Sequence, residues 1–594
     1  MKEGTAMNIA KISLVSVFLF LLFIAPAAGA IQVGGTLVIA VPSEPTSLAM
    51  NSALYAGLVE AQIYDTLLRF DSKLNLVPGL AESYYVNSTC GCYVFKLRTN
   101  ATWHDGKPVT ADDVKFTFEN LVPKYANYGV PYFPNTTVTI VNSTTVIIKP
   151  GVFAPAAQLQ LFADPSNTAI LPKHILEGQD FLKSSFLTNP VGSGPYKLSS
   201  WVKGSYIELV RNDNYWDDSK PYLSKIIIKF ISDPSTVVAG LKKGDINYVF
   251  IGVPYEAIND LKSNPKLNVT LYFRPPYIQA LQFNLNDSIL SNLLVRQAIA
   301  YAINRTDISL KATLGNAPVA DFVIDPDLVP PPSNLIHYDR NLTLANQLLD
   351  QAGYPRKADG SRFTIELLTR NLPETQTIAQ VLKEQLADVG INLNVKIVDL
   401  PTFLQLQSNY QYQMALIGFW ISPIWAYQLF HSAYIGKGAF SNPYHLNSSE
   451  VDSILDDWLH NSDPQKQIYD MQQLELYVNR NVVEIPLYRF VWINVIDKNF
   501  AGTDLPLGKY LVYDPIINTY YVPAQTSTQT QTTTSATTTS TTSVTTTSPA
   551  QTTTSTATSP QAGGGGLGGT TIVAVIIVVI ALAAAGLALG RRKR

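Results

Sequence analysis

The spacing between apolar positions changes several times along the chain, and each pattern predicts a helix, a strand or a turn. Residues 414–419 form an unbroken apolar run with the length of a buried strand. A Ser-Pro pair at 422–423 interrupts the run and predicts a turn. Trp420, Trp425 and Tyr427 surround this break. Trp and Tyr combine a large apolar face with a polar tip, so they fit a core or a cleft, and composition alone favours core.

Two helical patterns precede that run, and a strand pattern follows the second. Their apolar stripes are Leu344, Leu348 and Ala352, and then Ile378, Leu382 and Leu386. Gly353 and Gly390 stand where each stripe stops, which is the place that glycine favours after a helix. Residues 391–397 then alternate between apolar and polar, which predicts a strand. Helix and strand in alternation indicate an α/β lobe.

The first part of the chain contains strand patterns and one helix start. Residues 34–41 are rich in β-forming residues, and residues 93–98 alternate as a half-buried strand does. Thr110 is a candidate helix N-cap, with Asp113 three residues later as in a short capping box. Val114, Phe118 and Leu121 would give the following helix its apolar stripe.

The two ends of the chain have patterns typical of a secreted and membrane-anchored protein. Residues 1–30 resemble a signal peptide, with an apolar run and an Ala-Gly-Ala cleavage pattern. Residues 525–569 are rich in Thr and Ser and predict a disordered stalk. Residues 570–590 predict a transmembrane helix, and the basic tail 591–594 is expected on the cytoplasmic side. We therefore expect a single-pass protein of the cell membrane with its body outside the cell.

Composition agrees with an outward-facing body and excludes some partners. The 594 residues carry a formal net charge of −2, so nothing suggests nucleic acid. Asn87, Asn135, Asn142, Asn268 and Asn447 head N-x-S/T sequons, which predict a glycoprotein. The only 2 cysteines, at 90 and 92, fit a small disulfide or two free thiols equally well.

Several short segments, in order, resemble one known family. They are Val77-Pro78-Gly79-Leu80-Ala81-Glu82-Ser83, Trp103-His104-Asp105-Gly106, Thr110-Ala111-Asp112-Asp113-Val114, Leu171-Pro172-Lys173-His174-Ile175, Val191-Gly192-Ser193-Gly194-Pro195-Tyr196, Asn214-Tyr215-Trp216, and Tyr301-Ala302-Ile303-Asn304-Arg305. Together they cover about residues 34–522 and are similar to the peptide/nickel-type, family 5 solute-binding proteins of ABC importers. The anchor at the C-terminus, in place of a lipid-bearing Cys, looks archaeal.

The resemblance implies the architecture. We expect an α/β, two-lobed periplasmic-binding-protein fold of type II, similar to cluster C, with an extra inserted domain. Lobe I would combine residues 34–60, 185–268 and 487–522. The inserted domain would be 61–184, and lobe II would be 269–486.

The resemblance also implies the function. A monomeric receptor would close around a solute and dock on the membrane subunits of an ABC permease, which work with cytoplasmic ATPase subunits. Hinge closure would be driven by a ligand that touches both lobes only in the closed form. No cofactor or metal is expected.

The ligand class is less determined than the fold. Peptide-binding members of the family commonly place an Asp shortly after a Gly-Trp pair to hold the peptide amine. Residues 418–425 contain no acid, while Trp420 and Trp425 flank the same loop. We therefore favour an oligosaccharide, whose C–H faces suit indole rings, and keep an oligopeptide or dipeptide as the alternative.

The family's order moves the aromatic stretch toward the cleft, so we expect ligand contacts there. Trp420, Trp425 and Tyr427 are the predicted stacking surfaces. The other candidate ligand-binding residues are Tyr277, Asn51, Tyr55 and Asn284. A turn cap is the alternative role for Asn284, and core packing is the expected role of Trp103 and Trp216.

We predict no enzymatic activity. The sequence contains no H-E-x-x-H, G-x-S-x-G or P-loop motif, and its 6 histidines are scattered. His104 and His174 lie in the family's segments, where a structural role is expected, and His431 follows the aromatic stretch. A solute sensor or adhesion subunit without a permease, and a secreted hydrolase, are the remaining alternatives.

Overall fold

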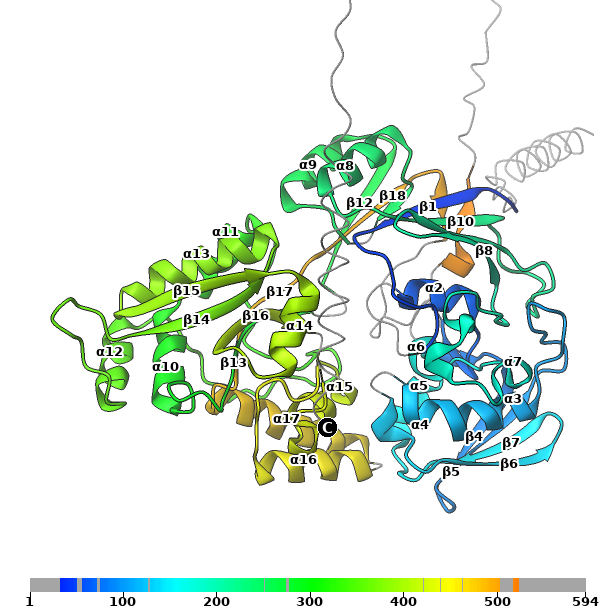
Figure 1. Ribbon diagram of the computed structural model, residues 1–594, viewed down its shortest axis with the longest axis horizontal. Coiled ribbons are helices and arrows are strands. Elements are labelled where there is room, and N and C mark those ends of the chain that lie inside the picture. The colour runs from blue at the N-terminus through cyan, green and yellow to red at the C-terminus, as the bar shows by residue number, and fades with distance from the viewer. Residues whose placement is uncertain are drawn as a thin grey trace, which may run out of the picture. The chain divides into compact units, whose positions relative to one another are not determined.

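The computed structural model describes ten segments of the chain (Figure 1). They are residues 33–50, 56–71, 75–126, 129–249, 251–273, 277–419, 421–438, 440–461, 463–502 and 516–522. The predicted signal peptide, stalk, transmembrane helix and basic tail lie outside them. None of the helices within these segments combines the length and the apolar character that crossing a bilayer requires.

The first lobe is built on a seven-stranded sheet. Its order is β12 (Leu267–Tyr272), β18 (Trp492–Asp497), β11 (Tyr248–Val249), β1 (Thr36–Val41), β10 (Lys225–Phe230), β9 (Tyr206–Arg211) and β8 (Tyr196–Val202). The first strand, β1, lies in the middle and pairs in parallel with β10 and β11. Helices α8 (Pro234–Lys243) and α9 (Ile258–Ser263) lie near β12 and β18 (Figure 1).

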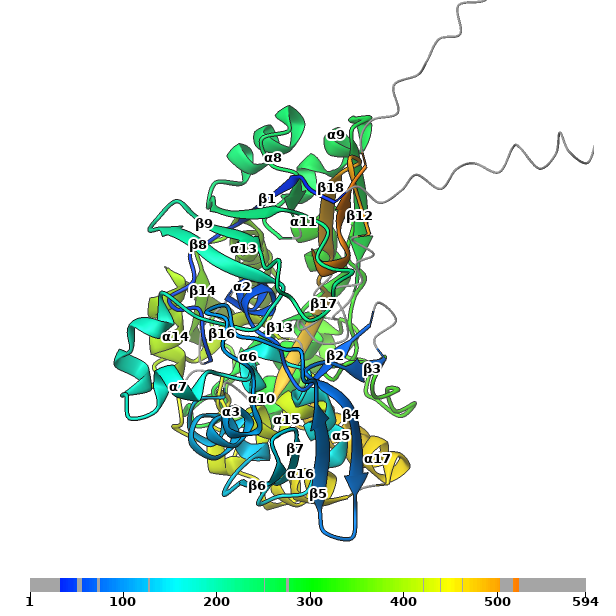
Figure 2. The same ribbon diagram turned by 90° about the vertical axis from the view of Figure 1, so that its right-hand side faces the viewer.

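A four-stranded antiparallel sheet forms the inserted part. Its order is β4 (Ala81–Asn87), β5 (Cys92–Leu97), β7 (Thr145–Lys149) and β6 (Thr137–Asn142), and Figure 2 shows β4 and β5 as a long hairpin. Cys90 and Cys92 form a disulfide in the turn of this hairpin, which decides between the two predicted states.

Short helices accompany that sheet. They are α2 (Ala56–Ile63), α3 (Ala111–Phe116), the π-helix η1 (Thr117–Leu121), α4 (Val122–Tyr125), the 3-10 helix η2 (Val130–Tyr132), α5 (Pro155–Leu161), α6 (Pro165–Thr168) and α7 (Lys173–Leu176). The backbone N–H of Thr110 donates to Asp113 Oδ2 over 2.8 Å at the start of α3, which confirms the predicted cap.

The second lobe is built on a five-stranded mixed sheet. Its order is β15 (Ile391–Val398), β14 (Phe363–Arg370), β16 (Met414–Phe419), β13 (Ile278–Phe283) and β17 (Glu484–Arg489). Strand β14 is parallel to β15 and β16, while β13 is antiparallel to both β16 and β17. Successive residues of β16 alternate between two apolar clusters, because each face of the sheet is covered by helices.

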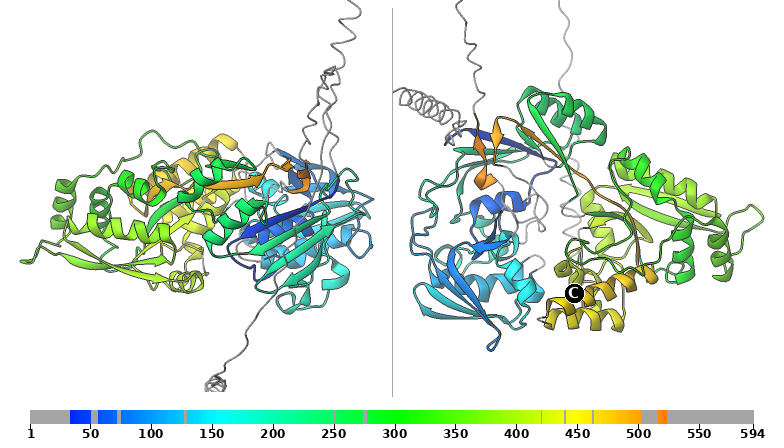
Figure 3. Two further views of the ribbon diagram at one scale, coloured as in Figure 1. Left: turned by 90° about the horizontal axis from the view of Figure 1, so that it is seen from above. Right: turned by 180° about the vertical axis from the view of Figure 1, so that it is seen from behind.

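Each face has its own group of helices. One cluster includes side chains of α10 (Leu293–Ala302), α11 (Arg305–Thr313), α12 (Leu342–Gln351) and α13 (Pro373–Ala387). The other includes side chains of α14 (Leu400–Ser408), α15 (Pro423–Phe430), α16 (Ser449–His460) and α17 (Pro464–Arg480). Figure 3 shows the ribbon of this lobe, in green to yellow, from above and from behind.

Two chain segments run side by side between the sheets. Strands β12 and β18 pair in the first lobe, and their continuations β13 and β17 pair in the second. The backbone N–H of Phe490 donates to the carbonyl of Tyr277 over 2.7 Å between them. Strand β17 ends at Arg489, and β18 of the first sheet begins at Trp492.

Candidate functional site

The aromatic stretch continues into a helix, which sequence reasoning missed. All six residues of β16 are buried, as the apolar run predicts. The hydroxyl of Ser422 accepts the backbone N–H of Trp425 over 3.3 Å, and Pro423 occupies the first helical position of α15. The Ser-Pro pair is therefore an N-cap and its following proline, a signal that was present in the sequence.

The predicted stacking surfaces do not form one face. Trp425 and Tyr427 are both half-buried, and residues two apart on a helix point in different directions. The Trp425 ring lies 6.2 Å from that of Phe440, whereas the Tyr427 ring lies 4.9 Å from His431. Trp420 lies outside the described residues, as do Asn51 and Tyr55.

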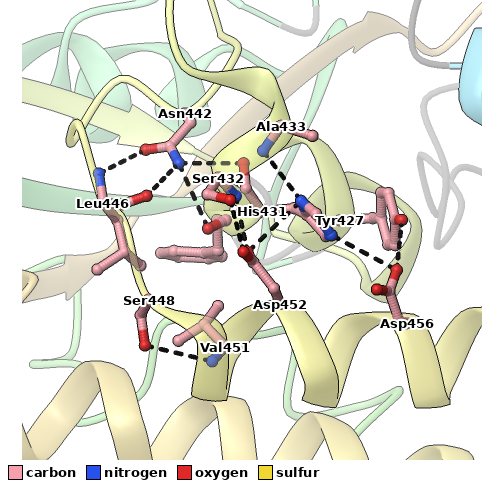
Figure 4. Close-up of polar contacts among 11 residues, drawn as sticks. Tyr427, His431, Ser432, Ala433, Asn442, Leu446, Ser448, Val451, Asp452 and Asp456 are labelled. Carbon is pink, nitrogen blue, oxygen red and sulfur yellow. Dashed lines mark hydrogen bonds and ion pairs between the residues drawn. The ribbon is translucent and has the colours of Figure 1, made fainter.

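A polar cluster holds the end of α15 on α16 (Figure 4). His431, whose side chain is 12% exposed, lies between Asp452 and Asp456, with nitrogen–oxygen distances of 3.5 and 3.4 Å. The backbone N–H of Ser432 donates to Asp452 over 2.8 Å, and that of Ala433 donates to His431 Nδ1 over 3.0 Å. The backbone just after α15 thus forms hydrogen bonds with both His431 and Asp452.

Tyr427 belongs to the same cluster. Its hydroxyl donates to Asp456 Oδ1 over 2.7 Å (Figure 4). Burial, together with this hydrogen bond, raises the pKa of the Tyr427 hydroxyl, so the phenol stays protonated and acts as a donor. Asp456 remains half exposed and can accept further hydrogen bonds.

Two acids therefore lie near the segment that has none of its own. Asp456 reaches Tyr427 from α16, and the backbone N–H of Asp325 donates to the carbonyl of Ile421 over 2.9 Å. Asp325 is 1% exposed, and its Oδ1 accepts the N–H of Asp327 over 2.9 Å. Residues 418–425 contain no acid, and the carboxylate of Asp456 reaches Tyr427, two residues beyond them.

Tyr277 lies at the connection between the two sheets. Its ring is 5.9 Å from Phe490 and 6.2 Å from Trp492, one on each side of the lobe boundary. A Cβ atom placed on Gly418 would lie 2.2 Å from Tyr277 Cε1, so the ring rests on the bare backbone of β16. Tyr277 thus contacts both the connection between the sheets and the strand that leads into α15.

Asn284 lies at the other end of β13. Its amide nitrogen donates to the carbonyls of Tyr410 and Tyr412 over 3.2 and 2.9 Å, and its oxygen accepts the N–H of Asn286 over 3.1 Å. The side chain is 6% exposed and fixes a turn. We therefore leave Asn284 out of the candidate site, because Tyr277 and α15 lie at the opposite strand end.

A polar group at the end of β14 was missed by sequence reasoning. Glu374, in the first turn of α13, accepts the hydroxyl of Tyr488, and burial raises the pKa of Glu374. Gln279 Nε2 and Thr369 Oγ1 are buried and find no hydrogen-bond partner among the described residues. Solutes bind at the carboxyl ends of parallel strands in open α/β sheets, and β14 ends at this place. The available signal was Pro373, which begins a helix just after a strand.

The histidines named from the sequence have structural partners. His104 Nε2 lies 3.1 Å from the carbonyl of Gly194, and burial lowers the pKa of His104 to about 4. His174 Nε2 lies 2.8 Å from Asp105. Within the described segments, no group of three or more His, Cys, Asp or Glu residues could hold a metal ion. Trp103 is buried, while Trp216 is half-buried under the guanidinium groups of Arg69 and Arg98.

Comparisons with known proteins agree on one family. Residues 75–441 match the model described as "Bacterial extracellular solute-binding proteins, family 5 Middle". The chain is 30% identical over 497 residues to the oligopeptide-binding protein AppA of Bacillus subtilis, covering 78% of this chain and 87% of that one. It is 26% identical over 486 residues to the glutathione-binding protein GsiB of Shigella flexneri, with 78% and 91% covered.

Solved structures give the same result. The chain is similar to B. subtilis AppA in complex with a nonapeptide, with a TM-score of 0.73, 26% identity, and 83% of this chain and 100% of that chain covered. It is also similar to NikZ of Campylobacter jejuni in complex with Ni(L-His), with a TM-score of 0.71, 27% identity, and 79% and 95% covered.

Proposed function

Because the chain belongs to the family 5 extracellular solute-binding proteins of ABC importers, we propose that it captures an oligopeptide outside the cell for such a transporter. Members of this family bind solutes and are not enzymes. The observation that carries the ligand class is the match along the whole length of a relative whose structure holds a nonapeptide. The permease and its ATPase subunits are the proposed partners.

The local geometry supports a peptide over the oligosaccharide that the sequence favoured. Trp425 and Tyr427 point in different directions from α15, so they do not make one flat stacking surface. Asp456 is a half-exposed carboxylate beside Tyr427, which suits a ligand with cationic or N–H groups. A sugar would use the rings, whereas a peptide would use this polar cluster and the carboxyl end of β14.

Closure would bring the lobes together at the hinge beside Tyr277. The ligand would stabilise the closed form because it contacts both lobes only there. The sequence pattern at residues 525–594 supports a tether that keeps a monomeric body near its permease. Removal of residues 570–594 would then release the protein from washed membranes, and retention of the truncated chain would contradict the tether.

Calorimetric titration separates the candidate ligands. The purified protein would be titrated with a pool of short peptides and with cello-, malto- and xylo-oligomers. Heat from the peptide pool alone supports the proposal. Heat from a glycan alone would replace the peptide by a sugar, and turnover of any probe would assign a hydrolase. Tight binding without permease genes beside this one would favour a sensor.

A further inference from the structure

A small cavity inside the second lobe is bordered by two buried carboxyl groups. Its volume is about 20 Å³, enough for a single water molecule. Glu475 of α17 and Glu484 of β17 both line it, together with Arg305 of α11. The side chains of Glu475 and Glu484 are almost fully buried, at 2% and 3% exposure. Neither residue belongs to the candidate site described above.

Glu475 supports the start of α15. Its carboxylate accepts the backbone N–H groups of Val323 and Ile324 over 3.0 and 2.8 Å. Ile324 in turn forms a parallel bridge with Ile421, the residue before the N-cap of α15. The Glu475 carboxylate therefore holds the short extended segment of Val323 and Ile324, and this segment pairs with Ile421 just after β16.

Glu484 supports the other end of α15. It accepts the hydroxyl of Tyr444 over 2.9 Å. The Tyr444 ring is stacked on Phe430, with 5.0 Å between centroids and 6° between planes. Phe430 is the last residue of α15. The two carboxyl groups thus act on opposite ends of the helix that carries Trp425 and Tyr427.

No cation is free to neutralise this pair. Among the described residues, no Lys, Arg or His nitrogen forms an ion pair with Glu475 or Glu484. Arg305 is bound to Asp321 over 2.7 Å and to the carbonyl of Ala320 over 2.7 Å. The titratable or charged groups that face the pair from neighbouring elements are Arg305, Asp321, Tyr338, Tyr412 and Tyr444.

Burial determines the protonation of the pair. It raises the pKa of Glu475 to about 7, and burial with the charge of Glu475 raises the pKa of Glu484 to about 8. Two buried carboxyl groups that line one cavity and form no ion pair of their own cannot both ionise cheaply, so they titrate as a coupled pair. At least one proton is retained in mildly acidic medium.

We propose that Glu475 and Glu484 are positioning residues that together retain a shared proton as they line one cavity, without a direct bond between them, hold both ends of α15, and make solute binding stronger in mildly acidic than in alkaline medium. Loss of the shared proton leaves two charges around one cavity, and the repulsion displaces the segments at Ile421 and Tyr444. The affinity effect rests on the proposed peptide-binding function, whereas the shared proton does not.

Infrared difference titration of the full chain tests the shared proton without any ligand. A carboxylic acid band is expected near about pH 6 and should be lost by about pH 9, because the pair titrates between these values. The band should be weaker in the Glu475→Gln/Glu484→Gln double variant than in the wild type, because other buried acids such as Glu374 can contribute to it, and unchanged in Glu450→Gln, whose carboxyl group is exposed on α16. A wild-type protein without the band would overturn the proposal.

Calorimetry with a fixed nonapeptide library tests the coupling. Apparent affinity of the wild type should fall about threefold to tenfold between about pH 6 and pH 8.5, and less in Glu475→Gln, which cannot ionise. Equal pH dependence in the two proteins would overturn the coupling. If no peptide binds at any pH, the proposed function fails, while the infrared result still decides whether a proton is shared.

Discussion

The hydroxyl of Tyr132 donates a hydrogen bond of 2.7 Å to the carbonyl oxygen of Ile424. Tyr132 belongs to η2 of the inserted part, and Ile424 is the second residue of α15 in the second lobe. The Tyr132 ring also lies edge-on to Tyr427 and Trp458, with centroids 6.5 and 6.4 Å away. The inserted part therefore contacts the helix that carries the predicted aromatic residues.

Replacement of Tyr132 tests that contact. Tyr132→Phe keeps the buried ring and removes one hydrogen bond, so the free energy of unfolding should fall by about 1 kcal/mol. Denaturant unfolding measures the change. Tyr469→Phe is the matched control, because Tyr469 is 53% exposed on α17. Equal stability of the two variants would mean that the contact contributes nothing in solution.

Gly418→Ala tests the packing of the Tyr277 ring on the backbone of β16. The new methyl group would lie 2.2 Å from Tyr277 Cε1 and 2.8 Å from Cδ1, so the ring must leave the strand. We expect a loss of about 1–3 kcal/mol in the free energy of unfolding and weaker peptide binding. Adding Tyr277→Ala removes the clash with the ring and leaves only the tight approach of 2.9 Å to the carbonyl oxygen of Ile278, so it should reduce the stability penalty of the alanine. A fully additive double variant would contradict the proposed contact.

Trp425→Ala tests the proposed ligand contact. If the indole touches the solute, affinity for the peptide pool should fall by about tenfold, or ~1.4 kcal/mol. Calorimetry gives the affinity, and circular dichroism confirms that the variant is folded. Trp201→Ala is the control, since Trp201 is half-buried on β8 in the first lobe and binds Glu44. Unchanged affinity in folded Trp425→Ala would restrict this side chain to packing.

Stability should depend on pH in a direction set by the buried acids. Burial raises the pKa of Glu475 to about 7 and that of Glu484 to about 8, so the folded protein retains protons that the unfolded chain releases. Their contribution is complete below the ordinary carboxyl pKa and is lost as pH rises through these values. His104 acts oppositely, because its pKa is lowered to about 4 and it binds its proton only on unfolding below about pH 6.5.

Between about pH 6.5 and pH 8, His104 no longer contributes to the pH dependence of the stability, so the effect of Glu475 and Glu484 can be measured separately. We expect the midpoint of thermal unfolding to fall across this window in the wild type and to fall less in Glu475→Gln. Differential scanning calorimetry at constant ionic strength makes the comparison. A midpoint that rises across the window would contradict the assignment.

Local patterns predicted many of the elements. The apolar run 414–419 is β16, and the stripe of Ile378, Leu382 and Leu386 is buried on α13. Gly353 and Gly390 have φ values of 87° and 82°, as residues that end helices do. Such signals succeed because caps, turns and periodicity depend on neighbours in the sequence. On the preceding helix, Leu348 and Ala352 of the predicted stripe pack half-buried against the core, while Ala345 and Leu349 are the residues that α12 buries fully.

The site depended on contacts that no local pattern contains. Glu475 binds the backbone of Val323, and Asp325 meets Ile421, across separations that only the fold brings together. Asn284 is a reasonable ligand candidate from the sequence, but in the fold its amide nitrogen donates to two backbone carbonyls. The sequence shows which residues neighbour Trp425 along the chain, but it does not show that Asp452 and Asp456 of α16 contact the end of α15.

Small-angle X-ray scattering of the purified protein with and without the peptide pool tests the central claim most directly. A receptor that closes around an oligopeptide should show a smaller radius of gyration at saturation, with no change on adding the oligosaccharide panel. Peptide binding that leaves the scattering curve unchanged would contradict capture by hinge closure.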